Sequence, residues 1–237
     1  MLQTALLKAS SLLFPMECET CGALLSAADG PGLCGACRRE IRRIAPPLCA
    51  ACGRPVRTRG GKCAPCLTER FHFDRAFACA VYDGKMKELL HAYKFHKKRA
   101  LKKFLAAMLL ECLASRLRDH SFHFVLPVPM DPGKWATRGF NPSALLSEEI
   151  SRKTGIPHDG ASLGRFRSDS PQFKLDKNGR AQNVKGLFWV NHQTFAGKRL
   201  LLVDDILTTG QTASECARVL KESGAADVTV LTCARGV

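Results

Sequence analysis

Two adjacent carboxylates, Asp204 and Asp205, and the small hydroxyl-rich turn that follows them are the residues best suited to chemistry in this chain. The apolar run before them, residues 200–203, is typical of a strand buried on both faces, so the acids are expected at a strand's carboxyl end. A turn that leads into a helix offers free backbone N–H groups and the positive end of a dipole, which bind phosphate. Because neighbouring carboxylates accept hydrogen bonds from vicinal hydroxyls or hold a Mg²⁺-bound water, the predicted ligand carries phosphate and ribose. The turn consists of Thr208, Thr209, Gly210, Gln211 and Thr212.

The elements that must position these groups predict an α/β domain with a parallel sheet. A helical pattern runs from the turn to Gly224, with Thr212 and Glu215 at the spacing of a capping box, and residues 228–232 follow as another buried strand. Residues 122–129 predict a further strand whose carboxyl end meets the acids at the same sheet edge. A P-loop is excluded, because no Gly-Lys pair is followed by Ser or Thr. The loop after this further strand contributes Met130, Asp131, Lys134 and Trp135.

Eight cysteines form four Cys-x-x-Cys pairs, separated by 12, 11 and 10 residues. This spacing is typical of structural zinc, where two hairpins supply four thiolates in a tetrahedron. We expect two sequential ribbons with one ion each, and a cross-braced arrangement is the alternative. Catalytic zinc is disfavoured, because all four positions of each ion are filled. The predicted ligands are Cys18, Cys21, Cys34, Cys37, Cys49, Cys52, Cys63 and Cys66.

A disulfide framework is the other interpretation of these cysteines. It is disfavoured because the chain lacks a secretory leader and carries four further scattered cysteines, as a reducing compartment allows. We therefore expect a cytoplasmic protein. The cysteine-rich segment is small and has few large apolar side chains, so we expect it to depend on its metals for stability.

The first residues predict a short amphipathic helix over 1–14, because apolar side chains share one face and Pro15 ends the pattern. The stretch is too short to cross a bilayer, and no transmembrane segment is expected. A docking helix is the favoured interpretation.

The chain is basic, with 36 Lys and Arg against 21 Asp and Glu and a formal net charge of +15. This balance favours a polyanionic partner or a phosphate-rich ligand. A helical pattern that starts at Lys85 and breaks near His96 interleaves cations with Tyr93, Phe95 and Phe104, which is the composition of a groove for single-stranded nucleic acid. We favour the alternative, in which the aromatic residues face the core and the cations face solvent. The nucleic-acid candidates are Lys94, Lys97, Lys98 and Arg99.

Residues 203–212 resemble the phosphoribosyl pyrophosphate (PRPP) motif of type I phosphoribosyltransferases. Together with the double zinc ribbon, the Pro127-Val128-Pro129 segment and the Arg138-Gly139-Phe140-Asn141 segment, this motif is similar to ComF-family proteins. The resemblance implies a type I phosphoribosyltransferase-like parallel-sheet domain preceded by a small cysteine-rich zinc-ribbon domain. It also implies a role in natural competence and in handling incoming single-stranded DNA.

The resemblance further implies roles for individual residues. Asp204 and Asp205 would bind the ribose hydroxyls, residues 208–212 the 5′-phosphate, and residues 130–135 the pyrophosphate. The implied cofactors are two structural Zn²⁺ ions, and Mg²⁺ bound with PRPP. No residue stands out as a general base, and the candidates for catalytic cations are Lys134, Arg165 and Arg180.

Three interpretations of function follow from these patterns. The first is a PRPP-binding protein that handles incoming single-stranded DNA; the second is an active phosphoribosyltransferase on an unknown base or nucleotide acceptor. The third is an adaptor that docks onto proteins of the DNA-uptake machinery. The expected units are the helix 1–14, a double zinc ribbon over 15–70 and the phosphoribosyltransferase-like domain over 71–237.

Overall fold

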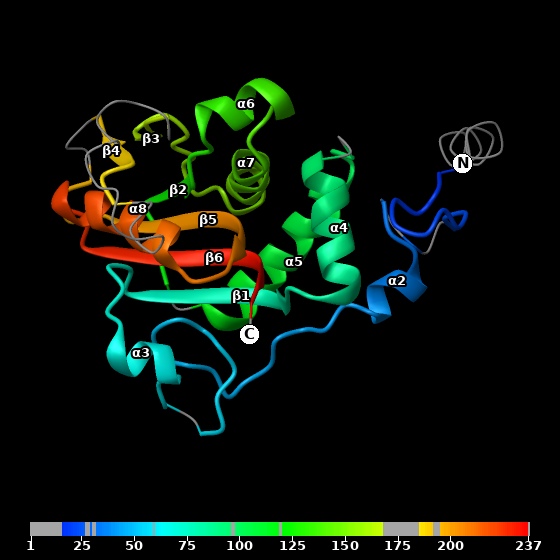
Figure 1. Cartoon of the computed structure of the whole chain (residues 1–237), viewed down its shortest axis with the longest axis horizontal. Coiled ribbons are helices and arrows are strands. Elements are labelled where there is room, and N and C mark those ends of the chain that lie inside the picture. Colours follow the sequence, from blue (N-terminus) through cyan, green and yellow to red (C-terminus); the bar gives the residue numbers. More distant parts are fainter. Residues whose placement is uncertain are drawn as a thin grey trace.

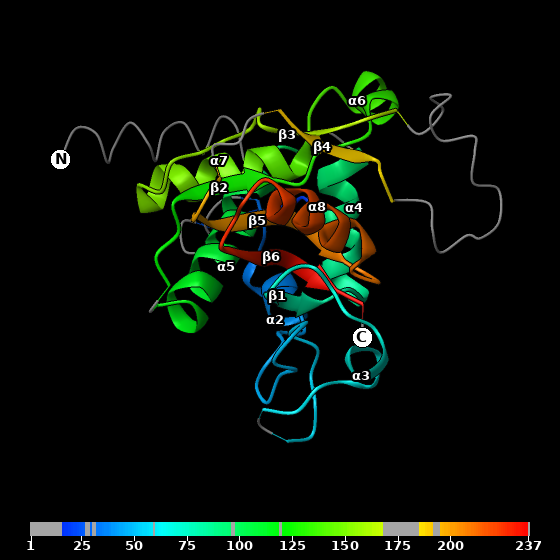
Figure 2. The ribbon, with the colours of Figure 1, turned by 90° about the vertical axis from the view of Figure 1, so that its left-hand side faces the viewer.

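The centre of the molecule is a parallel sheet of four strands, β1 (Arg75–Val81), β2 (Phe124–Pro127), β5 (Arg199–Leu207) and β6 (Asp227–Arg235). Their order across the sheet is β1-β6-β5-β2, which Figure 2 shows from bottom to top. A separate antiparallel pair consists of β3 (Leu163–Arg165) and β4 (Phe188–Val190). This computed structural model describes residues 16–26, 29, 32–58, 60–95, 98–118, 120–167, 185–191 and 195–236, so the predicted helix 1–14 lies outside the described residues.

Helices cover both faces of the sheet, because its central strands are apolar on both sides. Leu201 and Val203 of β5 pack in the cluster with α4 (Gly84–Phe95), α5 (Leu101–Arg116) and α7 (Pro142–Thr154). Leu200 and Leu202 pack on the opposite face, with α8 (Gln211–Glu222). The remaining described helices are α2 (Gly35–Arg39), α3 (Ala64–Thr68) and α6 (Pro132–Arg138).

Strand β5 is longer than the sequence predicted. It continues through both acids to Leu207, because β6 pairs with it along this whole length. On its other side β2 ends at Pro127, opposite Val203, whose carbonyl oxygen accepts the N–H of Val128 at 2.9 Å. The acids therefore lie where β5 has lost one neighbouring strand, which leaves that side open to side chains and ligands.

The long helical pattern after β1 is split as predicted. Helix α4 ends at Phe95 and α5 begins at Leu101, on either side of the expected break. Tyr93 and Phe104 are buried in the core, so the favoured core-facing interpretation holds for both, whereas it is wrong for Phe95, which is exposed at the end of α4. Within the described ranges no helix combines the length and apolar character needed to cross a membrane.

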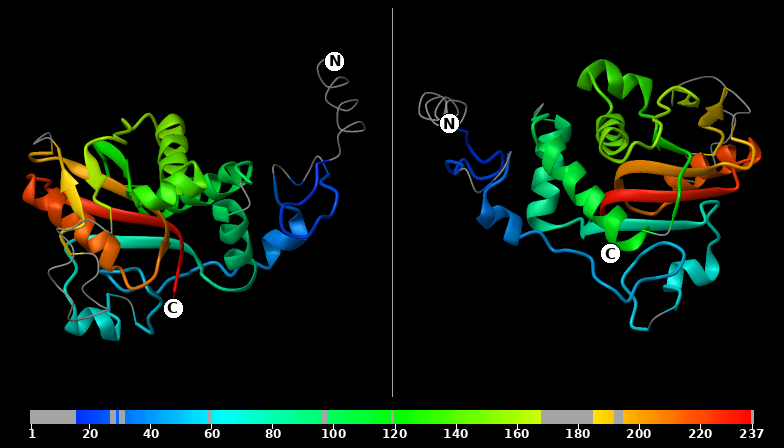
Figure 3. Two further views of the ribbon diagram at one scale, coloured as in Figure 1. Left: turned by 45° about the horizontal axis from the view of Figure 1, so that its top comes forward. Right: turned by 180° about the vertical axis from the view of Figure 1, so that it is seen from behind.

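The two cysteine-rich segments pack against different parts of the α/β domain (Figures 1 and 3). The first, with α2, lies beside α4, and the second, with α3, lies beneath β1. The chain between them pairs antiparallel with the outer edge of β1, where Val81 N–H donates to the Arg42 carbonyl at 2.9 Å and Ile44 N–H to the Cys79 carbonyl at 3.0 Å. This pairing covers a sheet edge that would otherwise expose unpaired backbone groups.

Candidate functional site

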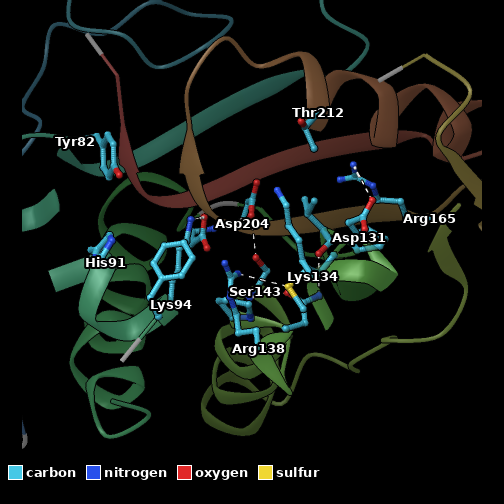
Figure 4. Close-up of a pocket in the computed structure, with 17 residues that line it drawn as sticks. Tyr82, His91, Lys94, Asp131, Lys134, Arg138, Ser143, Arg165, Asp204 and Thr212 are labelled. Carbon is cyan, nitrogen blue, oxygen red and sulfur yellow. Dashed lines mark hydrogen bonds and ion pairs between the residues drawn. The ribbon is translucent and has the colours of Figure 1, made fainter. Parts of the chain in front are cut away.

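A cavity of ≈ 340 Å³ lies at the carboxyl end of the sheet, and we call it the acid-pair cavity (Figure 4). Asp204 and Asp205 of β5 form its acidic wall. Lys134 of α6 and Arg165 of β3 supply cations on its other walls. Its volume falls within the range of small-molecule sites. The cavity therefore offers acceptors for hydroxyl groups and cations for phosphates in one space.

Asp204 is held by two hydrogen bonds on one carboxylate oxygen. The Ser143 hydroxyl donates to Asp204 Oδ1 at 2.8 Å, and the backbone N–H of Asp205 donates to the same oxygen at 2.9 Å. Burial raises the pKa of Asp204 to about 7, the negative charge of Asp205 raises it as well, and Lys94 and the Ser143 hydrogen bond oppose the rise. This carboxyl group therefore changes protonation near neutral pH.

Asp205 forms an ion pair with Lys94 in the last turn of α4. Lys94 Nζ lies 2.7 Å from Asp205 Oδ1, and the two side chains are only 18% and 10% exposed. The sequence grouped Lys94 with the nucleic-acid candidates, whereas the structure places its ammonium group in the acid-pair cavity. It offsets part of the charge of the two buried acids.

Ser143 is a site residue that the sequence analysis missed. It lies in the first turn of α7, where the Asn141 side chain accepts the Ser143 backbone N–H at 3.0 Å and donates to the Val128 carbonyl at 3.0 Å. Asn141 thus ties the start of α7 to the end of β2 and aims Ser143 at the acid pair. An Asn followed by Pro does indicate a helix start, but not which strand the helix meets. Tyr82 and His91 also line the cavity without having been predicted.

The loop after β2 brings most of its predicted residues to the cavity. Asp131 caps α6 by accepting the Gly133 N–H at 2.8 Å, and its other oxygen lies 3.6 Å from Arg165 Nη2. Met130 and Lys134 also line the acid-pair cavity, and Lys134 extends into it from α6 (Figure 4). Trp135 does not line the cavity, and its side chain is 52% exposed.

The predicted phosphate turn lies between β5 and α8, and Thr212 is its one residue that lines the cavity. Thr208 and Thr209 are exposed, and Gln211 begins α8. Gly210 is buried and has a φ of 88°, in the left-handed region that favours glycine, and an added Cβ would lie 3.0 Å from the Phe71 ring.

The capping box predicted for this helix is wrong. Gly210 occupies the N-cap position and makes no side-chain cap, so Thr212 lies inside the first turn. Glu215 instead accepts the backbone N–H of Gly186 and pairs with Arg218 at 2.7 Å. The carboxylate thereby joins α8 to the segment before β4.

Two of the other nucleic-acid candidates contact side chains of the protein itself. Lys98 pairs with Glu19 of the first cysteine-rich segment at 2.6 Å, and the Arg99 guanidinium lies 4.8 Å from the centre of the Phe140 ring. Since Tyr93 and Phe104 are buried, neither ring is available for stacking. Lys97 and Arg180 lie outside the described residues.

The eight cysteines of the Cys-x-x-Cys pairs form two clusters of four sulfurs, and in each cluster all sulfurs lie within 4.8 Å of one another. The Cys21 and Cys34 sulfurs are 3.7 Å apart, and those of Cys52 and Cys63 are 3.4 Å apart. A zinc tetrahedron with bonds of about 2.3 Å has sulfur–sulfur edges of about 3.8 Å, so the clusters fit the ion. The first four cysteines form one site and the last four the other, which is the sequential arrangement. Both are structural zinc sites with four thiolate ligands.

The second zinc site lies beside a buried cation. Arg235 at the end of β6 is 3% exposed, and its guanidinium donates to the backbone carbonyl of Cys52. Four thiolates outweigh the charge of one divalent ion, so a cation at this place stabilises the site. The arginine also links the second ribbon directly to the sheet.

Comparisons with known proteins agree with this architecture. Residues 9–67 match the model of the double zinc ribbon domain, and residues 137–236 match that of the phosphoribosyl transferase domain. Competence protein F of Haemophilus influenzae is 29% identical over 227 residues, covering 94% of this chain and 98% of that protein. The DNA utilization protein YhgH of Shigella flexneri is 30% identical over 205 residues, covering 84% and 88%.

Among solved structures, the glutamine PRPP amidotransferase of B. subtilis overlays with a TM-score of 0.40 and 24% identity. The overlay covers 55% of this chain and 25% of that enzyme.

Proposed function

The chain belongs to the ComF family, and on this premise we propose that it binds PRPP with Mg²⁺ and acts in natural competence, where it handles incoming single-stranded DNA. The observation that carries the proposal is the acid-pair cavity, in which two carboxylates and several cations face one space (Figure 4). The relatives are named for competence and DNA utilization, which supports the second part of the proposal.

Each wall of the cavity has a role in this proposal. Asp204 and Asp205 accept hydrogen bonds from the 2′ and 3′ hydroxyls of the ribose, and charge-assisted bonds of this kind are strong. The 5′-phosphate accepts hydrogen bonds from backbone N–H groups of the turn 208–212, which lies at the start of α8. Lys134 and Arg165 face the pyrophosphate, with Met130, Asp131 and Trp135 on the same loop and helix.

The oxygen-rich walls also suit the metal. Mg²⁺ prefers oxygen ligands and commonly binds through substrate phosphates, so it would enter with the pyrophosphate and neutralise part of its charge. If the protein transfers the phosphoribosyl group, Lys134 and Arg165, together with Arg180 from the segment between β3 and β4, would stabilise the leaving pyrophosphate.

The remaining parts of the chain fit the same proposal. We assign residues 15–70 to the zinc ribbons and 71–237 to the phosphoribosyltransferase-like domain, and the predicted docking helix over 1–14 lies outside the described residues. Eight thiolate ligands and four further free cysteines favour the reducing cytoplasm as the location.

Titration calorimetry of Mg²⁺-PRPP into the zinc-loaded full chain tests the proposal. Wild type should bind saturably, and an Asp204→Asn/Asp205→Asn double variant should bind at least about 100-fold more weakly, because two bonds to charged acceptors are lost. Glu222→Gln is the control, since this carboxylate is exposed at the far end of α8. Wild type that produces no binding heat, or a double variant that binds like wild type, would refute the PRPP site.

A further inference from the structure

Phe95, the last residue of α4, has an unusual environment for a phenylalanine. The residue is 58% exposed, whereas Tyr93 of the same helix and Phe104 of α5 are buried. An exposed ring gains no core packing, and the place where it lies is the edge of the acid-pair cavity. Because small-molecule sites are lined largely by apolar and aromatic side chains, a ring at the edge of a cavity is placed to contact a ligand.

A second cavity of ≈ 250 Å³ adjoins the first, and we call it the side cavity. Its lining residues are Lys94, Phe95, Lys134, Thr137 and Arg138, and all of them except Thr137 also line the acid-pair cavity. A ligand in the side cavity would therefore lie next to a sugar bound by the acids.

The side cavity combines the flat face of an aromatic ring with positive charge. The Arg138 guanidinium lies 4.8 Å from the centre of the Phe95 ring, and the His91 ring lies 4.7 Å from the same ring at an angle of 41°. Lys94 is neutralised by Asp205. Lys134 and Arg138, in contrast, have no carboxylate partner among the described residues, so their charges face the cavity.

This combination selects a class of ligand. Aromatic rings and guanidinium planes stack on nucleobases, and neighbouring cations bind the phosphates that nucleotides carry. An apolar peptide would meet two unpaired cations here, and an acidic peptide would not use the exposed ring. A nucleotide satisfies both features at once.

We propose that the side cavity binds one nucleotide, with its base packed against the Phe95–Arg138 pair and its phosphate held by Arg138. The inference rests on the proposed function, since it places the nucleotide beside the ribose site. The nucleotide is either free or one unit of a single strand. In both cases the contact surface comprises the end of α4 and α6, and it does not include Lys98, whose side chain pairs with Glu19.

The test uses zinc-loaded full-length protein and three probes, namely a labelled fifteen-residue oligo-dT, free TMP and Mg²⁺-PRPP. The variants are Phe95→Ala, which removes an exposed ring, and Arg138→Gln. Each should weaken binding of oligo-dT, of TMP or of both about tenfold, as expected for loss of one stacked base or one phosphate contact. Phe95→Tyr should restore binding, because it restores the ring.

Two controls separate this site from general effects. Lys153→Gln removes the same charge from the last turn of α7, roughly 15 Å along the helix from Ser143, at 1.5 Å per residue. Leu67→Ala removes an exposed apolar side chain from α3. Both should bind the probes within twofold of wild type.

The outcomes distinguish the possible sources of the nucleotide. Loss of oligo-dT binding alone in the Phe95 and Arg138 variants supports a single strand, and loss of TMP binding supports a free nucleotide. Wild-type affinity for both probes in both variants would overturn the proposal, as would a wild-type protein that binds neither probe. If PRPP binding fails while oligo-dT binding still depends on Phe95, the side cavity stands and the PRPP proposal falls.

Discussion

At the scale of single residues, the acid pair divides into two differently held carboxyl groups. Asp205 is neutralised by the Lys94 ammonium at 2.7 Å. Asp204 receives hydrogen bonds but has no cation of its own at that distance among the described residues, and burial raises its pKa to about 7. Two adjacent carboxylates in a largely buried site cannot both carry a full charge without cost, so one of them remains close to protonation.

PRPP affinity should therefore depend on pH. Ribose hydroxyl groups donate to the charged form of Asp204, so affinity should be about tenfold weaker at pH 6 than at pH 8, where that form predominates. Calorimetry at several pH values measures the change. Because the phosphates of PRPP also titrate near pH 6, the same series on Asp204→Asn gives the ligand's own contribution. Equal pH profiles for the two proteins would contradict the assignment.

Fold stability should respond to the same group with a defined sign. The pKa of Asp204 is about 7 in the folded protein, above its ordinary value of 3.8, so the folded state binds the proton more tightly than the unfolded chain. The contribution of protonated Asp204 to the free energy of unfolding is fully present below 3.8, the pKa of the unfolded chain. It is lost as the pH rises through about 7, the pKa of the folded protein.

Asp204→Asn removes this loss, because asparagine is neutral at every pH and keeps an oxygen for the Ser143 hydroxyl. Relative to wild type, the variant should gain on the order of 2 kcal/mol of unfolding free energy between pH 5 and pH 8. Urea denaturation at both pH values tests this, with Glu222→Gln as the exposed control. A difference between variant and wild type that does not change with pH would show that Asp204 titrates normally.

The sequence predicted part of this site and missed another part for a physical reason. The acids and the turn after them are consecutive, so their proximity follows from local structure. Lys94 and Ser143 are separated from them by many residues and reach them through packing of α4 and α7 on the sheet. In the sequence, Lys94 belongs to the same basic run as Lys98, and only the fold separates a cavity residue from one that pairs with Glu19.

At the scale of elements, glycines in the two zinc ribbons have equivalent sequence positions and different surroundings. Gly22 and Gly53 each follow a Cys-x-x-Cys pair and have φ values of 74° and 67°. An added Cβ at Gly22 would meet nothing within 4 Å, whereas at Gly53 it would lie 2.3 Å from the backbone oxygen of Ala76 in β1. The second ribbon therefore fits against the sheet through a glycine.

The substitutions Gly22→Ala and Gly53→Ala should separate these effects. The first should cost about 1 kcal/mol for the left-handed backbone alone. The second should cost about 3 kcal/mol or more, because the ribbon must also move away from β1. Thermal unfolding of both zinc-loaded variants measures the costs, and equal losses would show that the contact with Ala76 has no energetic role.

The extents of the elements were harder to predict than their existence. The break between α4 and α5 followed from the pattern of apolar residues, and the structure has it. The same pattern did not predict where β5 ends. Polar residues at 204 and 205 are typical of the end of a strand, whereas pairing with β6 continues β5 to Leu207. Backbone pairing thus overrides the polarity of the side chains.

At the scale of the whole molecule, the zinc sites are integrated into the cores of the α/β domain. Cysteines of the first ribbon pack in the cluster with α4 and α5, and those of the second pack with β6 and α8 on the other face. The sequence predicted the metal sites and their sequential pairing from spacing alone. It gave no indication that the ribbons would lie on different parts of the sheet domain, because their spacing constrains only local geometry.

Removal of zinc should therefore destabilise the sheet as well as the ribbons. A strong chelator should release two zinc ions per chain and lower the melting temperature of the whole protein by more than about 10 °C, since structural zinc contributes large folding energies. A zinc-saturated chelator is the control. Release of both ions with an unchanged melting temperature would show that the α/β domain is stable without its ribbons.

Binding of PRPP in the acid-pair cavity can be observed directly in a crystal structure of the zinc-loaded chain grown with Mg²⁺ and PRPP. Density for the ligand is expected in the acid-pair cavity, with its ribose hydroxyls on Asp204 and Asp205 and its 5′-phosphate at the turn before α8. Ligand density at another place, or a cavity without ligand at PRPP concentrations that saturate binding in solution, would contradict it.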